Sequence, residues 1–267
     1  MKAKSYLAFL LAGALMFGGV SCKKDEEEDE NNTPTPTVDT TPPTVSLERP
    51  RVDPETRNAG GHMHFRGTFN DNVELGEYKI DIHDVFDGHS HDKVSSYFAW
   101  SYEVTTPLSG KEEFVDIIIN IPNDAMPGKY DLLLFVTDKA GNSLNVNGRN
   151  FIERQFFVSN ADFDAEVVLD VTSPSDGDVF VHGASTITVT GNFSAPIEIE
   201  ELEITIKDSN GNKVYDHDIH VHNETYSLNH SIPVPSSWSD GNYELEIEIE
   251  LENGLHYHKE IDIVVGH

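Results

Sequence analysis

The sequence of 267 residues has a single cysteine, Cys22, and few basic residues. One cysteine excludes a disulfide scaffold and any cysteine-based zinc module. Lysine and arginine number 18 against 47 acidic residues, which gives a net charge of −29. Because phosphate groups are bound by clustered positive side chains, we do not expect this chain to bind nucleic acid. Histidine, in contrast, is abundant, with 13 residues, and such a bias is typical of metal binding.

Sequence motifs of common enzyme classes are also missing. The chain has no phosphate-binding loop of the form G-x-x-x-x-G-K-[ST], no H-E-x-x-H zinc motif and no G-x-S-x-G nucleophile motif. We therefore expect a binding protein and not an enzyme.

The first 22 residues have the layout of a bacterial signal peptide. Lys2 and Lys4 precede an apolar stretch over 6–17, and small residues lead from there to Cys22. About 15 apolar residues fall short of the roughly 20 that a transmembrane helix needs. The segment before Cys22 resembles a lipobox, which implies that residues 1–21 are removed and that a lipid on Cys22 holds the chain at a membrane.

Residues 22–43 are expected to form an extended tether. Six acidic residues occupy positions 25–30, and the segment 31–43 is rich in threonine and proline, which cannot build a core. An acidic run directly after the lipidated cysteine resembles the export signal of surface lipoproteins in the Bacteroidetes. The resemblance implies an outer-membrane lipoprotein exposed at the cell surface.

The rest of the chain contains an internal repeat. Residues 67–84 align with residues 191–208 and are identical at seven of 18 positions. The identical pairs are Gly67/Gly191, Phe69/Phe193, Glu74/Glu198, Glu77/Glu201, Ile80/Ile204, Ile82/Ile206 and Asp84/Asp208. A second match follows, because Pro122, Gly128 and Tyr130 keep the spacing of Pro235, Gly241 and Tyr243. We therefore predict two copies of one domain, over residues 44–160 and 163–267.

Each copy consists of short runs in which apolar and polar residues alternate, without an amphipathic helix. In the first copy these runs are 62–69, 77–84, 96–104, 113–121, 129–137 and 151–158. About seven strands in about 110 residues is typical of an immunoglobulin-like β-sandwich. The sequence thus predicts an all-β protein with two tandem immunoglobulin-like β-sandwich domains after the signal peptide and tether.

Four pairs of histidines have the spacing H-x-H. On a strand, residues i and i+2 lie on the same face, so both imidazoles of a pair can approach one metal ion. Imidazole pairs suit zinc or copper when one or two further nitrogen or oxygen ligands are near. The pairs are His62/His64, His89/His91, His220/His222 and His256/His258.

In the first copy, alternation predicts that several of these histidines meet at one end of the sandwich. His62 and His64 alternate with apolar residues and should point outward, as should His83 at the end of the next strand. The loop that follows carries Asp87, His89 and His91. We predict a zinc or copper site from these six residues; the alternative is an exposed polar loop with a structural His83.

In the second copy the corresponding positions hold Thr186, Thr188 and Lys207, so this site is missing. Outward-facing histidines occur elsewhere and suggest a second, weaker set of ligands. Its members are His220, His222, His256, His258 and Glu250. The loop between the last two strands should have an odd length, which predicts Glu252 opposite His256 and Glu250 opposite His258. The alternative is an ordinary solvent-exposed polar face.

Three strings carry a family resemblance: GHMHF at 61–65, KIDIH at 79–83 and FDGHSH at 86–91. They resemble an uncharacterised family of Bacteroidetes lipoproteins with an immunoglobulin-like fold. The resemblance implies a surface or periplasmic lipoprotein and a histidine ligand set for a metal, but no activity.

Two functional hypotheses follow. In the first, the chain captures zinc or copper and hands it to an outer-membrane receptor. In the second, it is an adhesion or glycan-binding stalk with exposed aromatic residues, for which Tyr97, Phe98, Trp100 and Trp238 are the candidates. Calcium is a third ligand to consider, because residues 160–164 place Asn160, Asp162 and Asp164 between the two copies.

Overall fold

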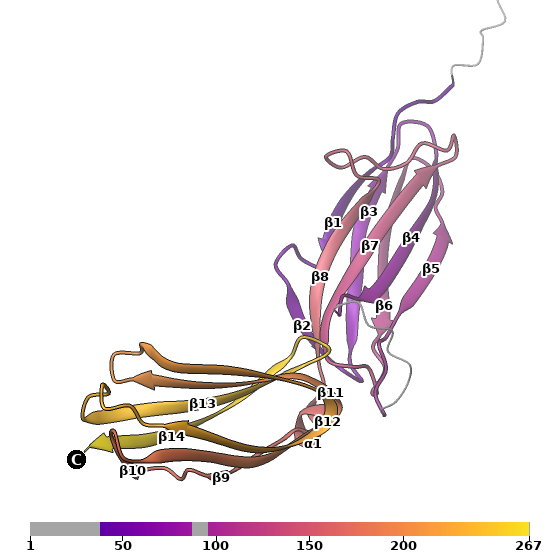
Figure 1. Cartoon of the computed structure of the whole chain (residues 1–267). Helices are drawn as coiled ribbons and strands as arrows, with labels where there is room; N and C mark the ends of the chain where they lie inside the picture. The colour runs from indigo at the N-terminus through magenta and orange to yellow at the C-terminus, as the bar shows by residue number, and fades with distance from the viewer. Residues whose placement is uncertain (1–37, 87–95, 267) are drawn as a thin grey trace, which may run out of the picture. The chain divides into compact units, whose positions relative to one another are not determined.

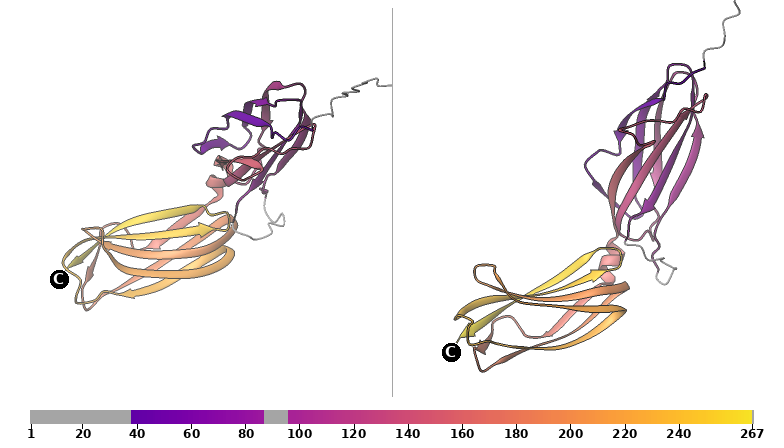
Figure 2. Two further views of the ribbon diagram at one scale, coloured as in Figure 1. Left: turned by 90° about the horizontal axis from the view of Figure 1, so that it is seen from above. Right: turned by 45° about the horizontal axis from the view of Figure 1, so that its top comes forward.

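The structure, a computed structural model, describes residues 38–86 and 96–266 (Figure 1). Within these ranges the chain forms fourteen β-strands and one short helix, α1 (Ala161–Glu166). Strands β1–β8 build one β-sandwich and strands β9–β14 build a second one, and the views in Figure 2 show the two layers of each. The prediction of an all-β protein with sandwich domains is confirmed. None of the described residues belongs to a helix long and apolar enough to cross a lipid bilayer.

The first sandwich has a three-stranded layer, in the order β1-β3-β6, and a five-stranded layer, in the order β2-β8-β7-β4-β5. Its strands are β1 (Thr44–Arg49), β2 (Glu55–Asn58), β3 (His62–Asn70), β4 (Leu75–Asp84), β5 (Tyr102–Pro107), β6 (Glu112–Asn120), β7 (Gly128–Asp138) and β8 (Phe151–Ser159). The chain passes from one layer to the other between β3 and β4. The outward faces of these two neighbouring strands therefore belong to different layers.

Alternating apolar residues form the core between these layers. Phe65 and Phe69 of β3 are fully buried, and each ring stacks on Tyr78 of β4, with centroid distances of 5.7 and 5.3 Å. Aromatic side chains bury large areas, so this group holds the two layers together.

Strands β1 and β2 of the first sandwich were not among the predicted runs, and β5 begins later than predicted. β2 has the sequence ETRN, which contains no apolar residue and thus no alternation to detect. The run predicted at 96–104 is a strand only from Tyr102 onward, because Tyr97 and Trp100 instead turn into the core from irregular backbone.

The second sandwich is built around one long hairpin. Its strands are β9 (Val168–Ser173), β10 (Asp178–Val181), β11 (Thr186–Asp208), β12 (Lys213–Pro233), β13 (Gly241–Leu251) and β14 (His256–Gly266). The first part of β11 pairs with β9, whereas its second part pairs with β13, and β12 accompanies both parts. The hairpin therefore belongs to both layers, and its pairing is interrupted between Ser194 and Ile199.

The internal repeat in the sequence corresponds to a repeat in the structure. β11 takes the place of both β3 and β4. Residues 190–194 pair with β9 as β3 pairs with β1, and residues 199–208 pair with β13 as β4 pairs with β7. Gly67 and Gly191 recur for one reason. A Cβ atom would lie 3.1 Å from the carbonyl oxygen of Ser46 at the first glycine, and 2.6 Å from that of Asp170 at the second.

Both sandwiches also contain a tyrosine corner, a hallmark of immunoglobulin-like folds. The hydroxyl of Tyr130 donates to the carbonyl of Met126 at 2.8 Å, and that of Tyr243 donates to the carbonyl of Ser239 at 3.0 Å. The glycine two residues earlier has a positive φ in both, 133° at Gly128 and 154° at Gly241. Burial raises the pKa of Tyr130, so the hydroxyl keeps its proton and remains a donor.

Candidate metal-binding sites

His62 and His64 lie on the outer face of β3, as alternation predicts. Met63 and Phe65 between and beside them are buried, and the two imidazole rings lie 5.6 Å apart in an edge-to-face arrangement. Nδ1 of His64 is 3.6 Å from Oδ1 of Asp116 on the neighbouring strand β6. The pair thus has one carboxylate close to it.

Three arginine side chains lie near His64. A pocket of about 340 Å³ is lined by His64 together with Arg49, Arg57 and Arg66. Arg66 also hydrogen-bonds to Asp116 and thereby lowers the pKa of that carboxyl below its usual value. Arg49 and Arg57 form ion pairs with Glu55, and Arg66 forms one with Asp116. Three guanidinium groups against two carboxylates leave a net positive charge, which opposes the approach of another cation. His64 therefore stands in poor electrostatic surroundings for a metal ligand.

The structure does not bring His83 to this pair. His83 points outward from β4, where its Nδ1 lies 3.3 Å from Oδ1 of Asp81. Because the inward residues of β3 and β4 meet in the core, the outward residues of the two strands lie on opposite faces of the sandwich. The prediction that His62, His64 and His83 converge is wrong in this respect. Asp87, His89 and His91 lie outside the described residues.

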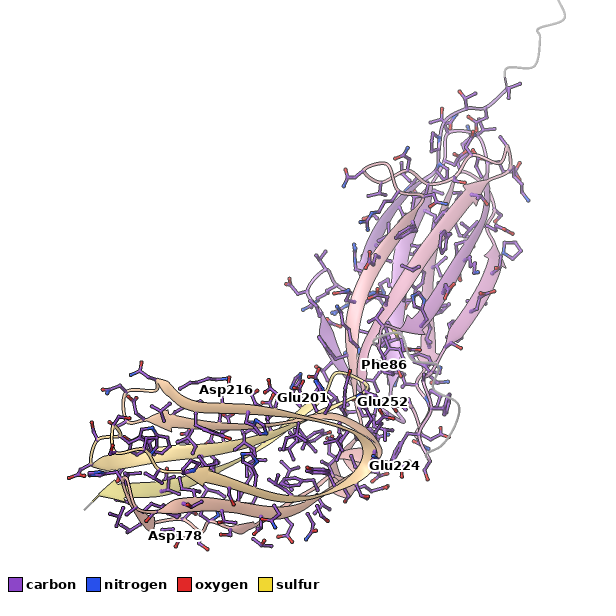
Figure 3. All side chains as sticks on the ribbon, viewed as in Figure 1. Phe86, Asp178, Glu201, Asp216, Glu224 and Glu252 are labelled. Carbon is purple, nitrogen blue, oxygen red and sulfur yellow. The ribbon has the colours of Figure 1, made fainter. Side chains whose placement is uncertain are left out.

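The outer face of the second sandwich carries an ordered array of acidic and histidine side chains. Glu244, Glu246, Glu248 and Glu250 alternate with buried residues along β13. Glu201 and Glu203 of β11 lie opposite Glu250 and Glu248, on one side of β13. His256 and His258 of β14 lie opposite the same two glutamates, on the other side. Figure 3 labels Glu201 and Asp216 in this layer.

The register of the last hairpin differs from the prediction by two residues. His256 pairs with Glu250 and His258 pairs with Glu248, instead of with Glu252 and Glu250. The turn has the expected odd length, but it consists of residues 252–254, because the backbone N–H of Leu251 donates to the carbonyl of Leu255. Nδ1 of His256 lies 2.8 Å from Oε1 of Glu248, and Nε2 lies 3.7 Å from Oε1 of Glu250.

Three side chains of this array form a group with metal-binding potential. One ligand atom each from Glu246, Glu248 and His258 lies within 4.8 Å of the others. Lys207 hydrogen-bonds to Glu246 and, at 3.3 Å, to Glu244, which raises the pKa of the lysine. A second lysine, Lys213, hydrogen-bonds to Glu203 at 2.7 Å, and the two lysines line a pocket together with Glu246 and Glu248.

The remaining ligands predicted in the second copy lie apart from this group. His220 and His222 are on β12, which β11 and β13 separate from β14. Their rings stack at 6.2 Å, and Nδ1 of His222 lies 2.9 Å from Oε1 of Glu198. With three strand spacings of roughly 4.8 Å between the two edges, the four histidines cannot bind one ion.

Two other histidines of the second sandwich, on different parts of β12, lie in contact with each other. The rings of His217 and His230 stack with centroids 4.4 Å apart, and Nε2 of His230 lies 2.6 Å from the hydroxyl of Tyr215. The strand halves that carry them belong to different layers. Burial, together with the charge of His217, lowers the pKa of His230.

Residues 160–164, which were considered for calcium, instead form the N-cap and the first turn of helix α1. The side-chain oxygen of Asn160 accepts hydrogen bonds from the backbone N–H groups of Asp162 and Phe163 and so caps helix α1. Oδ1 of Asp164 accepts a hydrogen bond of 2.6 Å from the hydroxyl of Tyr257. These oxygens are thus occupied by the capping and docking of a short helix.

The aromatic residues considered for glycan binding belong to the hydrophobic core or pack against it. Tyr97 and Trp100 are 5% and 4% exposed, and Phe98 and Trp238 pack against the core. Among the described residues, Phe114 and Phe157 are the large aromatic side chains that are exposed, and the sequence alone did not single them out.

A third acidic group, unnoticed in the sequence, lies at the end of the first sandwich. Carboxylate oxygens of Asp39, Asp71 and Asp138 come within 4.8 Å of one another. The three residues are 32 and 67 positions apart along the chain. No local motif could therefore have revealed them.

Comparison with known families gives one match, within the first part of the chain. Residues 20–152 match the family described as a domain of unknown function, DUF4625. No curated protein matches the sequence.

Solved structures with a similar fold are distant in sequence. The fibronectin(III)-like modules of CbhA from Clostridium thermocellum are 14% identical, with 83% of this chain and 94% of that one covered and a TM-score of 0.33. A tetra-tandem repeat from the extending region of a large adhesion protein is 19% identical, with 84% and 49% covered and a TM-score of 0.43. The present chain thus spans about half of that repeat structure.

Proposed function

We propose that this protein is a surface lipoprotein that binds a divalent transition metal, zinc or copper, on the outer face of its second sandwich. The ligands are Glu246, Glu248 and His258. The observation that carries the proposal is that their ligand atoms lie within 4.8 Å of one another. Two ligand atoms on one zinc ion are about 3.4 Å apart. Rotation of partly exposed side chains brings the three atoms to that spacing.

The chemistry of the ligands favours a transition metal over calcium. An imidazole nitrogen suits zinc and copper, whereas calcium is bound by oxygen atoms alone. His256, two residues from His258 on the same face, adds a nitrogen ligand close to Glu248. The group therefore offers both nitrogen and oxygen ligands.

Electrostatic repulsion in the array also favours a bound cation. Glu246 of β13 lies directly opposite Glu260 of β14. Like charges at opposed positions of neighbouring strands destabilise a sheet. A divalent cation between β13 and β14 relieves this repulsion.

The second sandwich is favoured over the histidines of the first. His64 shares its pocket with three arginines, and His83 lies on the opposite face. A metal site at His62 and His64 would need further ligands from Asp87, His89 and His91, which lie outside the described residues.

Isothermal titration with Zn²⁺ and Cu²⁺, on protein purified without a histidine tag, tests the proposal. We expect one ion to bind at this face, and we expect Glu248→Gln and His258→Gln each to weaken binding at least tenfold. Asp262→Asn is a matched control, because it removes one negative charge from the same face of β14. Unchanged affinity in both ligand variants would rule out this site.

The lipoprotein part of the proposal depends on the sequence at Cys22 and on the acidic tether behind it. A lipid at Cys22 holds the metal site at the outer surface, where an outer-membrane receptor can accept the ion. Labelling of growing cells with a radioactive fatty acid tests the anchor. The chain should take up label, and Cys22→Ser should abolish the label and release the protein from the membrane fraction. Label that persists in Cys22→Ser would contradict the anchor.

The alternative function, an adhesion or glycan-binding stalk, has less support. The four aromatic residues considered for it are buried or packed against the core. A glycan array probed in the absence of metal distinguishes the two functions, since only a stalk of this kind would bind there.

A further inference from the structure

Asp39, Asp71 and Asp138 meet at one end of the first sandwich. Asp39 precedes β1, Asp71 follows β3, and Asp138 is the last residue of β7. Strand pairing brings them together, because Thr44 at the start of β1 pairs with Asn70, and Leu75 at the start of β4 pairs with Asp138. The group therefore joins both layers of the sandwich and the chain that enters it.

One oxygen of this group is buried without a partner. Oδ1 of Asp71 accepts hydrogen bonds of 2.8 Å from the backbone N–H groups of Val73 and Glu74, whereas Oδ2 is buried and has no hydrogen-bond partner. As whole residues, Asp138 is 5% exposed, whereas Asp39 and Asp71 are half-buried. A buried carboxylate oxygen without a partner loses its hydration without compensation, so it is rare in native proteins.

The three carboxylates lack a basic partner among the described residues; Nζ of Lys111 donates to the carbonyl of the neighbouring residue Asn72 at 2.7 Å. No lysine or arginine of the described residues forms an ion pair with any of the three. Their side-chain partners are neutral amides: Asn72 donates to Asp39 at 3.1 Å, and Asn142 donates to Asp138 at 2.7 Å. Buried charges are normally paired or bound to a metal.

The second sandwich shows that the fold does not need these acids. In the aligned repeat, Ala195 stands at the position of Asp71 and Leu251 at that of Asp138. The pairing agrees, since Leu251 pairs with Ile199 as Asp138 pairs with Leu75. Ala195 and Leu251 are buried, with 8% and 0% exposure. The same place in the fold is thus filled by apolar side chains in one copy and by carboxylates in the other.

We propose that Asp39, Asp71 and Asp138 bind a calcium ion. All three ligands are hard carboxylate oxygens and no imidazole is among them, which suits calcium and not zinc or copper. The carbonyl oxygen of Asp39, which now accepts a hydrogen bond from Asn142, is a further oxygen within the group. The bound ion fastens the segment before β1 to the loops that follow β3 and β7.

Calcium titration of the full chain, followed by calorimetry and by thermal unfolding, tests this proposal. We expect saturable binding of calcium and a rise in the unfolding temperature of the first sandwich. Asp39→Asn lies outside every strand and should fold normally, yet it should weaken calcium binding at least tenfold. Asp53→Asn, at an exposed position of the same sandwich, is the matched control and should bind as the unchanged protein does.

A second variant introduces the apolar residues that the second sandwich has at these positions. Asp71→Ala combined with Asp138→Leu should fold, and its unfolding temperature should no longer respond to calcium. No saturable calcium binding, or unchanged affinity in Asp39→Asn, would overturn the proposal. The zinc site is tested separately, because Glu248→Gln should leave calcium binding unaltered.

Discussion

Glu248 of β13 lies directly opposite His258 of β14, and on its other side it lies directly opposite Glu203 of β11. The glutamate thus faces a metal ligand in one direction and a like charge in the other. An opposite charge at either of these positions would stabilise the sheet, but neither residue opposite Glu248 is a lysine or an arginine.

Replacement of His258 by lysine should therefore separate stability from metal binding. His258→Lys creates an opposite-charge pair with Glu248 and should stabilise the second sandwich by about 0.2–1 kcal/mol. It also removes the nitrogen ligand, so zinc binding should be lost. Denaturant unfolding without metal and zinc calorimetry measure the two effects, and a His258→Lys variant that still binds zinc would contradict the proposed ligand set.

A methyl group at Gly191 should destabilise the second sandwich. Its Cβ would lie 2.6 Å from the carbonyl oxygen of Asp170, a backbone atom that cannot move without disturbing β9. We expect Gly191→Ala to lower the free energy of unfolding by roughly 1–3 kcal/mol. Gly266→Ala is the control, because nothing lies within 4 Å of its Cβ position. Equal stability of the two variants in urea would refute the explanation of the repeated glycine.

Loss of the buried hydroxyl of Tyr130 should destabilise the first sandwich. The hydroxyl donates to Met126 and accepts from the backbone N–H of Trp100 at 3.3 Å, so Tyr130→Phe leaves two buried backbone groups without this partner. We expect a loss of about 1–3 kcal/mol in urea unfolding. Tyr243→Phe should produce a smaller loss, since Tyr243 is 6% exposed and Tyr130 is fully buried. The reverse order would be inconsistent with this explanation.

The stability of the second sandwich should decrease at acidic pH through His230. Its pKa is lowered from 6.5 in the folded chain by burial and by His217, so the unfolded chain binds the proton more readily. This contribution to stability is complete above about pH 6.5 and decreases as the pH falls below that value. His217 and the hydroxyl of Tyr215 are the titratable groups in contact with His230.

His230→Gln keeps a hydrogen-bonding side chain without a titrating ring, so it should flatten the dependence of the unfolding temperature on pH between 7 and 5. His222→Gln, where the side chain is 62% exposed, should not flatten it. If both variants follow the unchanged protein, His230 is not the source of the acid sensitivity.

Alternation was enough to predict which residues of β3, β4, β13 and β14 face the core. It was sufficient because one face of each strand is buried and a shift of one residue would expose every apolar side chain. Alternation does not tell to which layer a strand belongs, so it predicted His83 at the same end as His62 without showing that the two lie on opposite faces. A shift of two residues preserves the faces, so the register of Glu250 and His256 could not be predicted by the same argument.

The aspartate group illustrates a different limit. Asp39, Asp71 and Asp138 are brought together only by the folding of three distant segments. One signal was nevertheless present in the sequence, because the aligned repeat replaces Asp71 by Ala195 and Asp138 by Leu251. A polar residue in one copy and an apolar residue at the same place in the other indicate a local function beyond the fold.

The unbroken strand β11 has a consequence for how fast each sandwich folds. Near its turn, the hairpin with β12 pairs residues that are close in sequence, such as Ile206 with Tyr215, and local contacts form quickly. In the first sandwich, β3 instead pairs with β6, which lies more than forty residues further along the chain. The second sandwich should therefore refold first after dilution from urea, which stopped-flow fluorescence of Trp238 against Trp100 can resolve. The part of the chain made last would then be ready before the part made first.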